Sequence, residues 1–92
     1  MKEAPVWRVE FHPDAARDLR KLGHEARRLV LTYLRKRIAT TDDPRRFGHP
    51  LVGDLKGFWR YRVGDFRVLV SIKDDRLLVL VVTVGHRREV YD

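Results

Sequence analysis

The stretch Trp59-Arg60-Tyr61-Arg62-Val63-Gly64-Asp65-Phe66-Arg67-Val68 decides the fold of this chain. Polar and apolar residues alternate on both sides of Gly64-Asp65, which is the pattern of a tight β-hairpin with a short loop. In such a hairpin Arg62 lies directly opposite Arg67, and Arg60 shares the face of Arg62. Like charges that face each other across antiparallel strands destabilise a sheet. A bound anion would explain this face, which we call the arginine face.

The sequence around the hairpin predicts a small α+β domain with the element order β-α-α-β-β-β. Apolar residues recur at helical or strand spacing in successive segments, and residues 40–50, rich in proline and aspartate, are predicted as loop. The expected elements are a strand over Val6–Phe11, helices over Asp14–Leu22 and His24–Ala39, and strands over Phe58–Val63, Phe66–Lys73 and Arg76–Val84. We expect a single domain over residues 1–92, in which an antiparallel sheet carries a helical hairpin packed on one face.

Strand alternation also assigns side chains to the two faces of the sheet. The helix-covered face is expected to hold Trp59, Tyr61, Val63, Phe66, Val68, Val70 and Ile72. The arginine face is expected to hold Arg60, Arg62, Arg67, Ser71 and Lys73. The last strand is apolar on both sides, as expected of a strand in the middle of a covered sheet.

Charge and composition narrow the classes of function. The formal net charge is +7, so polyanions are the first partners to consider. The chain has no cysteine, which excludes a disulfide framework and a thiol nucleophile. Its 4 histidines lie on different elements without ligand spacing, and we expect neither a metal nor another cofactor. Because we find no signal pattern and no apolar run of membrane length, we expect a cytoplasmic protein that binds no membrane.

The ending Val84-Gly85-His86-Arg87-Arg88-Glu89-Val90-Tyr91-Asp92 is the second concentration of reactive side chains. It follows the last strand, whose neighbour begins at Phe66, so His86, Arg87 and Tyr91 can curl back over the arginine face. Several arginines with one histidine and one tyrosine suit attack of a ribose 2′-hydroxyl on its own 3′-phosphate. Fixed guanidinium groups would stabilise the charge on the pentacovalent phosphate. His86 is the first choice for proton transfer, with Tyr91 positioning or assisting.

These features resemble the RelE branch of the RelE/ParE toxin superfamily. The resemblance rests on the element order, the Arg60-x-Arg62…Arg67 hairpin and the ending just quoted, and it extends to Phe11-His12-Pro13-Asp14-Ala15, Leu19-Arg20-Lys21-Leu22 and Pro50–Leu55. It implies a toxin of a type II toxin–antitoxin system, acting as a ribosome-dependent, metal-independent endoribonuclease that cleaves mRNA in the A site and inhibits translation. It also implies a cognate RelB-like antitoxin that wraps the toxin and masks its basic face.

The resemblance gives roles to single residues. Arg67 and Arg87 match arginines that hold the scissile phosphate in the family, and Tyr91 matches a tyrosine that stacks on the substrate base. His86 stands where members have a lysine or a histidine. Arg60 and Arg62, on the strand predicted over Phe58–Val63, match basic residues of the family. The expected catalytic set is therefore Arg60, Arg62, Arg67, His86, Arg87 and Tyr91. The expected RNA-binding set is Arg60, Arg62, Lys73 and Arg88.

Two other functions stay open. ParE-like toxins of the same superfamily share the fold, poison DNA gyrase and lack ribonuclease activity. The combination of Arg67, His86, Arg87 and Tyr91 favours the ribonuclease over the gyrase poison. A non-catalytic basic module that binds RNA or the ribosome is a further alternative, and such a module would keep its full effect on cells without His86 and Tyr91.

Overall fold

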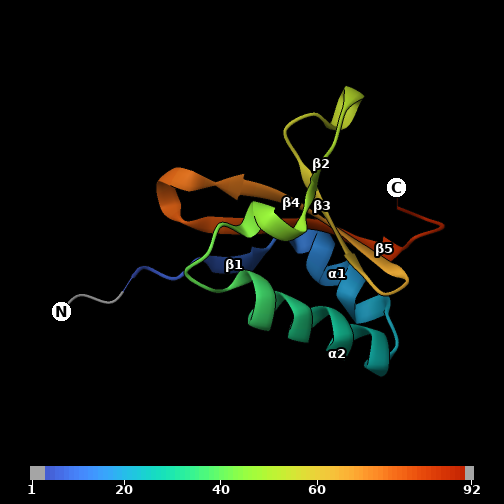
Figure 1. The fold of residues 1–92 in the computed structure, drawn as a ribbon. Helices are drawn as coiled ribbons and strands as arrows, with labels where there is room; N and C mark the ends of the chain where they lie inside the picture. The colour runs from blue at the N-terminus through green and yellow to red at the C-terminus, as the bar shows by residue number, and fades with distance from the viewer. Residues whose placement is uncertain (1–3, 91–92) are drawn as a thin grey trace.

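The computed structural model describes residues 4–90 of the 92-residue chain (Figure 1). Its strands are β1 (Arg8–Phe11), β2 (His49–Pro50), β3 (Trp59–Val63), β4 (Phe66–Lys73) and β5 (Leu78–His86). Its helices are α1 (Pro13–Lys21) and α2 (His24–Tyr33), and a π-helical segment over Leu34–Ile38 prolongs α2. Short 3₁₀ turns occupy Pro44–Phe47, Gly53–Leu55 and Asp74–Arg76. No helix in this described part has the length and hydrophobicity that crossing a bilayer requires.

The strands form one sheet in the order β1-β5-β4-β3-β2. The predicted α+β class and the order of the predicted elements are confirmed, and His49–Pro50 adds a short edge strand in the segment predicted as loop. The expectation of an antiparallel sheet is wrong at one place, because β1 pairs with β5 in the parallel direction, with Arg8 opposite Leu78. Side-chain alternation indicates which residues share a face but carries no information on strand direction. The sheet is therefore mixed.

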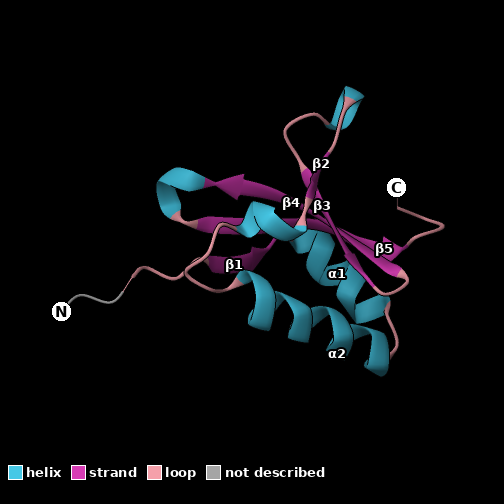
Figure 2. Cartoon of the chain, viewed as in Figure 1, coloured by secondary structure: helices cyan, strands magenta, loops and turns pink. Residues whose placement is uncertain are grey.

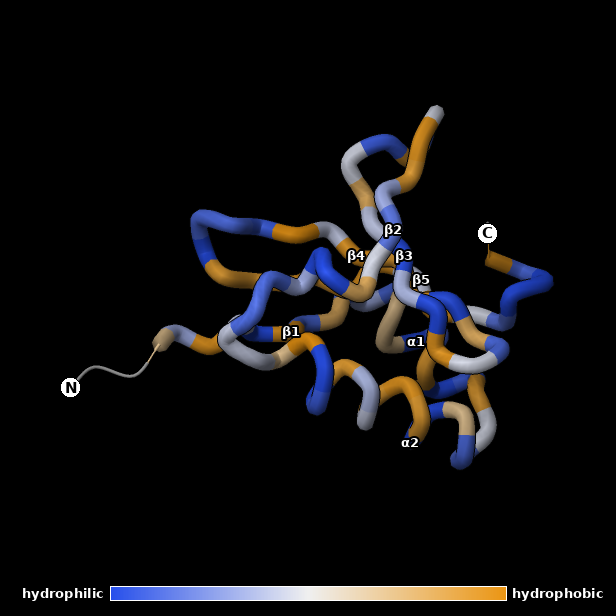
Figure 3. The backbone as a smooth tube through the Cα atoms, in the orientation of Figure 1, coloured by the Kyte–Doolittle hydropathy of each residue, from blue (hydrophilic) through white to orange (hydrophobic). Residues whose placement is uncertain are grey.

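Both helices pack on one face of the sheet (Figure 2). Hydrophobic and hydrophilic residues alternate along α2 (Figure 3), as expected of a helix with one buried side. The core between the layers buries Val30 and Ile38 from the α2 side, and Tyr61 and Val70 from the sheet. Every side chain predicted for the helix-covered face belongs to this core or packs against its edge, so that assignment is confirmed.

Tyr61 ties the segment after α2 to the core. Its hydroxyl donates a hydrogen bond to the carbonyl oxygen of Pro44 at 2.7 Å, and its ring lies 5.9 Å from that of Tyr33, centroid to centroid. Burial raises the pKa of the Tyr61 phenol well above its ordinary value, so the hydroxyl stays protonated and keeps its role as donor. This anchor holds the chain that leads into β2 beside the sheet.

Candidate functional site

The hairpin that carries the arginines has the predicted register. Arg62 of β3 lies opposite Arg67 of β4, and Arg60 lies opposite Leu69. The loop is Gly64-Asp65, and Gly64 has a φ of 60°, in the left-handed region that a short hairpin loop requires. Because side chains alternate along both strands, the three arginines are directed to the face of the sheet that the helices leave uncovered. Arg62, at the edge of β3, also borders a hollow that is lined by residues of α2.

The three arginines differ in exposure. Arg62 is exposed, whereas Arg60 and Arg67 each keep only 6% of their surface accessible. The Nη1 group of Arg67 donates to the carbonyl oxygens of Gly64 and Phe66, at 3.0 Å in each case. These bonds hold the guanidinium against the hairpin turn and satisfy part of its hydrogen-bonding capacity, as a buried charge requires. The arginine face therefore combines two largely covered arginines, of which Arg67 is held against the turn, with one exposed arginine.

A second apolar cluster lies on the arginine face. It consists of Leu51, Leu69 and Val90, with Leu55, Phe58 and Val82 packed against it. Val90 reaches this cluster from the chain end, and a Cβ added at Gly85 would lie 2.5 Å from Cγ2 of Val90. Glycine at position 85 thus leaves the room that the returning chain needs. The chain thus returns to the arginine face at Val90. Tyr91, which was predicted to lie over this face, is outside the described residues.

Arg87 is fastened to the loop of the hairpin. Its backbone N–H donates to the carbonyl oxygen of Asp65 at 2.8 Å, and its Nη1 lies 3.9 Å from Oδ1 of the same residue. Arg67 is bound to the neighbouring carbonyl of Gly64, so the structure brings Arg67 and Arg87 to one turn. Sequence reasoning missed the part that Asp65 plays here, because aspartate is common in turns and nothing local indicates a distant partner.

His86 does not join the arginines. It pairs with Phe66 across β4 and β5, and the two rings meet edge to face, 5.8 Å apart at their centroids and inclined by 83°. Phe66 packs against the core on the helix-covered face. A cavity of about 310 Å³ on that side is lined by His86 together with Asp18 and Lys21 of α1 and with Glu89. The histidine therefore faces α1 rather than the arginine face.

A β-bulge in β5 causes this placement. The register shifts between Leu69 and Val70 of β4, where β5 inserts Val82 as an extra residue. An extra residue reverses the side to which all following residues point. In an unbroken strand, steps of two from Val82 would carry His86 to the arginine face. The expectation that His86 curls over the arginines is wrong, because the bulge returns it to the helix side.

The two remaining predicted RNA-binding residues lie apart from each other. Lys73 ends β4 far from the hairpin turn, roughly 20 Å along the strand from Arg67 at the usual rise per residue. It cannot contact the same phosphate as Arg67. Arg88 is exposed in the turn after β5, next to Arg87. Across residues 4–90, no group of 3 or more histidine, cysteine, aspartate or glutamate side chains is placed to hold a metal ion.

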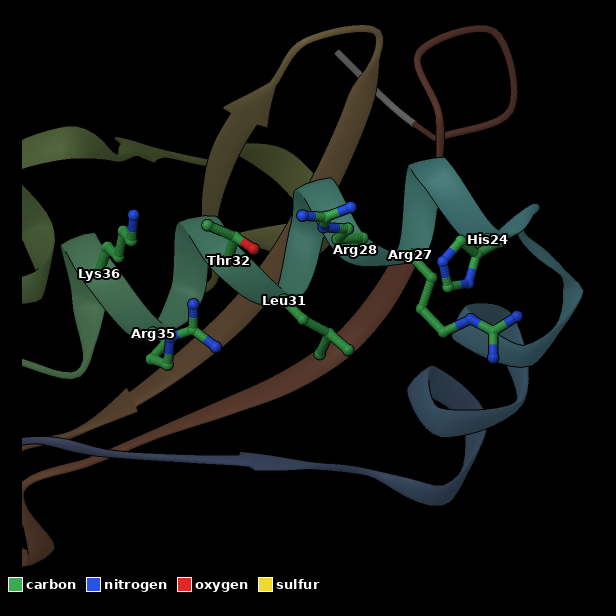
Figure 4. A pocket seen from close by; sticks show the side chains of 7 residues that line it. All are labelled: His24, Arg27, Arg28, Leu31, Thr32, Arg35 and Lys36. Atoms are coloured by element: carbon green, nitrogen blue, oxygen red, sulfur yellow. The ribbon is translucent and has the colours of Figure 1, made fainter.

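A second basic surface runs along the outer side of α2 (Figure 4). It surrounds a shallow hollow of about 460 Å³, and we call it the α2 stripe; its residues are His24, Arg27, Arg28, Leu31, Thr32, Arg35 and Lys36. None of its arginines or its lysine forms an ion pair with a carboxylate of the described residues. In contrast, Arg45 is bound to Asp74 at 2.6 Å. The α2 stripe therefore presents charge that no ion pair within residues 4–90 neutralises.

Comparison with known proteins identifies the class. Residues 9–91 match the family described as the ParE toxin of the type II toxin–antitoxin system parDE. Toxin RelG of Mycobacterium tuberculosis is 32% identical over 83 residues, which are 90% of this chain and 93% of that protein. The chain is thus a toxin of a type II toxin–antitoxin system. More particularly, the chain belongs to the RelE family within the RelE/ParE superfamily, which confirms the resemblance.

Solved structures agree with this assignment. The toxin–antitoxin complex RelBE2 of M. tuberculosis matches with a TM-score of 0.83 and 30% identity, over 95% of this chain and 98% of that chain. The intact RelBE complex of E. coli matches with a TM-score of 0.66 over 87% of this chain and 95% of that chain, and at 17% identity it supports the fold alone.

Proposed function

We propose that this toxin is a ribosome-dependent endoribonuclease that cleaves mRNA in the A site and thereby inhibits translation. The observation that carries the proposal is the cross-strand pair of Arg62 and Arg67, with Arg87 fastened to the same hairpin turn. Facing guanidinium groups repel each other, and a phosphate bound between them would offset the repulsion. Arg62 and Arg87 are exposed and would meet RNA first, while buried Arg60 and Arg67 would act as fixed positive charges beneath.

The proposed reaction is attack of a ribose 2′-oxygen on the adjacent phosphorus. The 2′-hydroxyl gives up its proton, a 2′,3′-cyclic phosphate forms, and the 5′-oxygen of the next nucleotide leaves with a proton. The arginines would stabilise the negative charge that grows on the non-bridging oxygens. Guanidinium stays protonated in proteins, so none of the arginines serves as the base. Tyr91 is the proposed residue that stacks on the substrate base, and the scheme uses no metal ion.

The proposed partners are the ribosome with its mRNA and a RelB-like antitoxin. The M. tuberculosis RelBE2 structure, which is 30% identical to this chain, is a toxin–antitoxin complex, and this supports an antitoxin for this chain. A net charge of +7 favours contact with the RNA of the ribosome. The α2 stripe belongs to the helical layer and meets the arginine face at the edge of β3, where Thr32 and Lys36 border the same hollow as Arg62. It would bind ribosomal RNA while the arginine face, together with exposed Lys73 and Arg88, meets the mRNA.

A gyrase poison is the second candidate, because the matched family is described by the ParE toxin. Purified protein mixed with programmed ribosomes, followed by primer-extension mapping of the mRNA, separates the two functions. We expect codon-phased cuts that disappear in Arg62→Ala and in Arg67→Ala. Arg76→Ala is the matched control, because Arg76 is an exposed arginine in the turn before β5, and this variant should keep the cuts. Intact mRNA together with trapped gyrase–DNA complexes would support the second candidate instead.

A further inference from the structure

The turn that follows β5 is organised by His86. Its ring nitrogen Nδ1 accepts a hydrogen bond from the N–H of Arg88 at 3.2 Å. Its carbonyl oxygen accepts from the N–H groups of Glu89 and Val90, at 2.8 and 3.0 Å. A side chain that accepts from the N–H group two residues further on has the geometry of an Asx turn. The edge-to-face contact with Phe66 holds the imidazole in the orientation that this bond needs.

The chain uses histidine in the same way at a second place. Nδ1 of His12 accepts from the N–H of Asp14 at 3.1 Å and caps the start of α1. Helix α1 packs on the helix-covered face (Figure 2), so this cap lies on the other side of the sheet from the arginine face. An imidazole that accepts a hydrogen bond from the backbone N–H two residues further on therefore occurs twice in this chain, and His12 offers a matched control for His86.

The surroundings of His86 fit such a role. Asp18 and Lys21 face it from α1, and Glu89 faces it from the turn. The carboxylate of Asp18 accepts from the N–H of Val84 at 3.0 Å, which ties this end of β5 to α1. The ring is thus set among groups that fix the strand end, on the side of the sheet opposite the arginines.

We propose that His86 is a positioning residue, which acts through the hydrogen bond from Arg88 to its Nδ1. This bond orders the turn that fastens Arg87 to Asp65 and carries Val90 onto the arginine face. His86 does not touch the scissile phosphate and carries no proton in the reaction. The inference rests on the proposed function for its cleavage readout, whereas the order of the turn is measured independently.

The test compares two substitutions that replace the two ring nitrogens separately. In asparagine the acceptor Oδ1 is attached to Cγ, as Nδ1 is in histidine, whereas the acceptor of glutamine lies one bond further out, where Nε2 would be. In His86→Asn the Arg88 amide should keep its hydrogen-exchange rate, and cleavage should stay within about threefold of wild type. In His86→Gln the exchange rate should rise and cleavage should fall, each roughly fivefold to tenfold, as expected for one lost hydrogen bond.

Two controls make the comparison specific. His12→Asn and His12→Gln should show the same contrast at the Asp14 amide without a change in cleavage, because that cap is remote from the arginines. In an Arg87→Ala background, His86→Gln should reduce cleavage little further, because a positioning residue that acts through Arg87 has nothing left to align.

Each outcome decides the matter. Equal amide exchange in His86→Asn and His86→Gln would overturn the proposal, and so would an ordered but inactive His86→Asn, which would make His86 a participant in the chemistry. Increased cleavage by His86→Gln would also overturn it, because the turn would then block access to the arginine face and would not position Arg87 for cleavage. If wild type cuts no mRNA, the proposed function fails, and the exchange rates of the Arg88 amide still decide whether His86 orders the turn.

Discussion

Replacing Gly85 by alanine should detach the chain end from the arginine face. The new Cβ would lie 2.5 Å from Cγ2 of Val90, closer than two carbon atoms can approach. Val90 is β-branched, so rotation about χ1 gives little relief. Val90 is now 8% exposed, and losing its burial costs about 1.5–3 kcal/mol, while alanine in a strand gains roughly 0.5–1 kcal/mol over glycine. We expect the free energy of unfolding to fall by about 1–2 kcal/mol, a shift in Tm of roughly 4–16 °C for a domain of this size.

Shortening Val90 should remove the collision. In a Val90→Ala background the nearest atom to the new Cβ is the Cβ of residue 90 at 3.9 Å, which is an ordinary contact. Gly85→Ala should then be neutral or stabilising, which gives a coupling free energy of about 2 kcal/mol between the two substitutions. Urea unfolding of wild type, both single variants and the double variant, followed by tryptophan fluorescence, measures it. An equal cost of Gly85→Ala in both backgrounds would refute the packing of Val90 on Gly85.

Three further predictions concern charge. Arg62→Ala should reduce mRNA cleavage. It should leave the free energy of unfolding unchanged or raise it by up to about 0.5 kcal/mol, because it removes the like-charge pair on the arginine face. Clear destabilisation in urea would mean that the pair is structural. Arg28→Glu combined with Lys36→Glu should weaken co-sedimentation with ribosomes at least about tenfold at low salt, and unchanged binding would contradict the role of the α2 stripe. The hydrogen bond from Arg45 lowers the pKa of the Asp74 carboxyl in the folded state. The pair therefore stabilises the fold above the unfolded-state pKa, and this contribution is lost as the pH falls through the folded-state pKa. The difference in Tm between wild type and Asp74→Asn should be small at neutral pH and vanish in acid, and a difference that grows in acid would reverse the sign of this linkage.

Local chemistry made much of the fold predictable. The hairpin register follows from the alternation of β3 and β4 and from Gly64, and both signals lie within one short stretch. The direction of β1 could not be found in this way, because it depends on where two intervening helices return the chain. The burial of Arg60 and Arg67 was equally hidden, since the residues that gather over the arginine face come from the segment after β2 and from the chain end.

The predicted placement of His86 over the arginine face was wrong because of the sequence of β5. The valines and leucines of β5 make both of its sides apolar. If the bulge were placed at another position in this run, each face of the sheet would still receive an aliphatic side chain. Alternation therefore cannot locate the bulge, which places Val82 in the small cluster on the arginine face and Val84 in the main core. The glycine at position 85 supplies the missing signal. Opposite Arg67 it is needed, because any Cβ there meets Val90, whereas on the helix side a glycine would leave a gap in the core. If Gly85 must lie beneath the returning chain end, the next residue, His86, must point to the helix side. This condition favours the observed register, with the bulge at Val82, over the register of an unbroken β5.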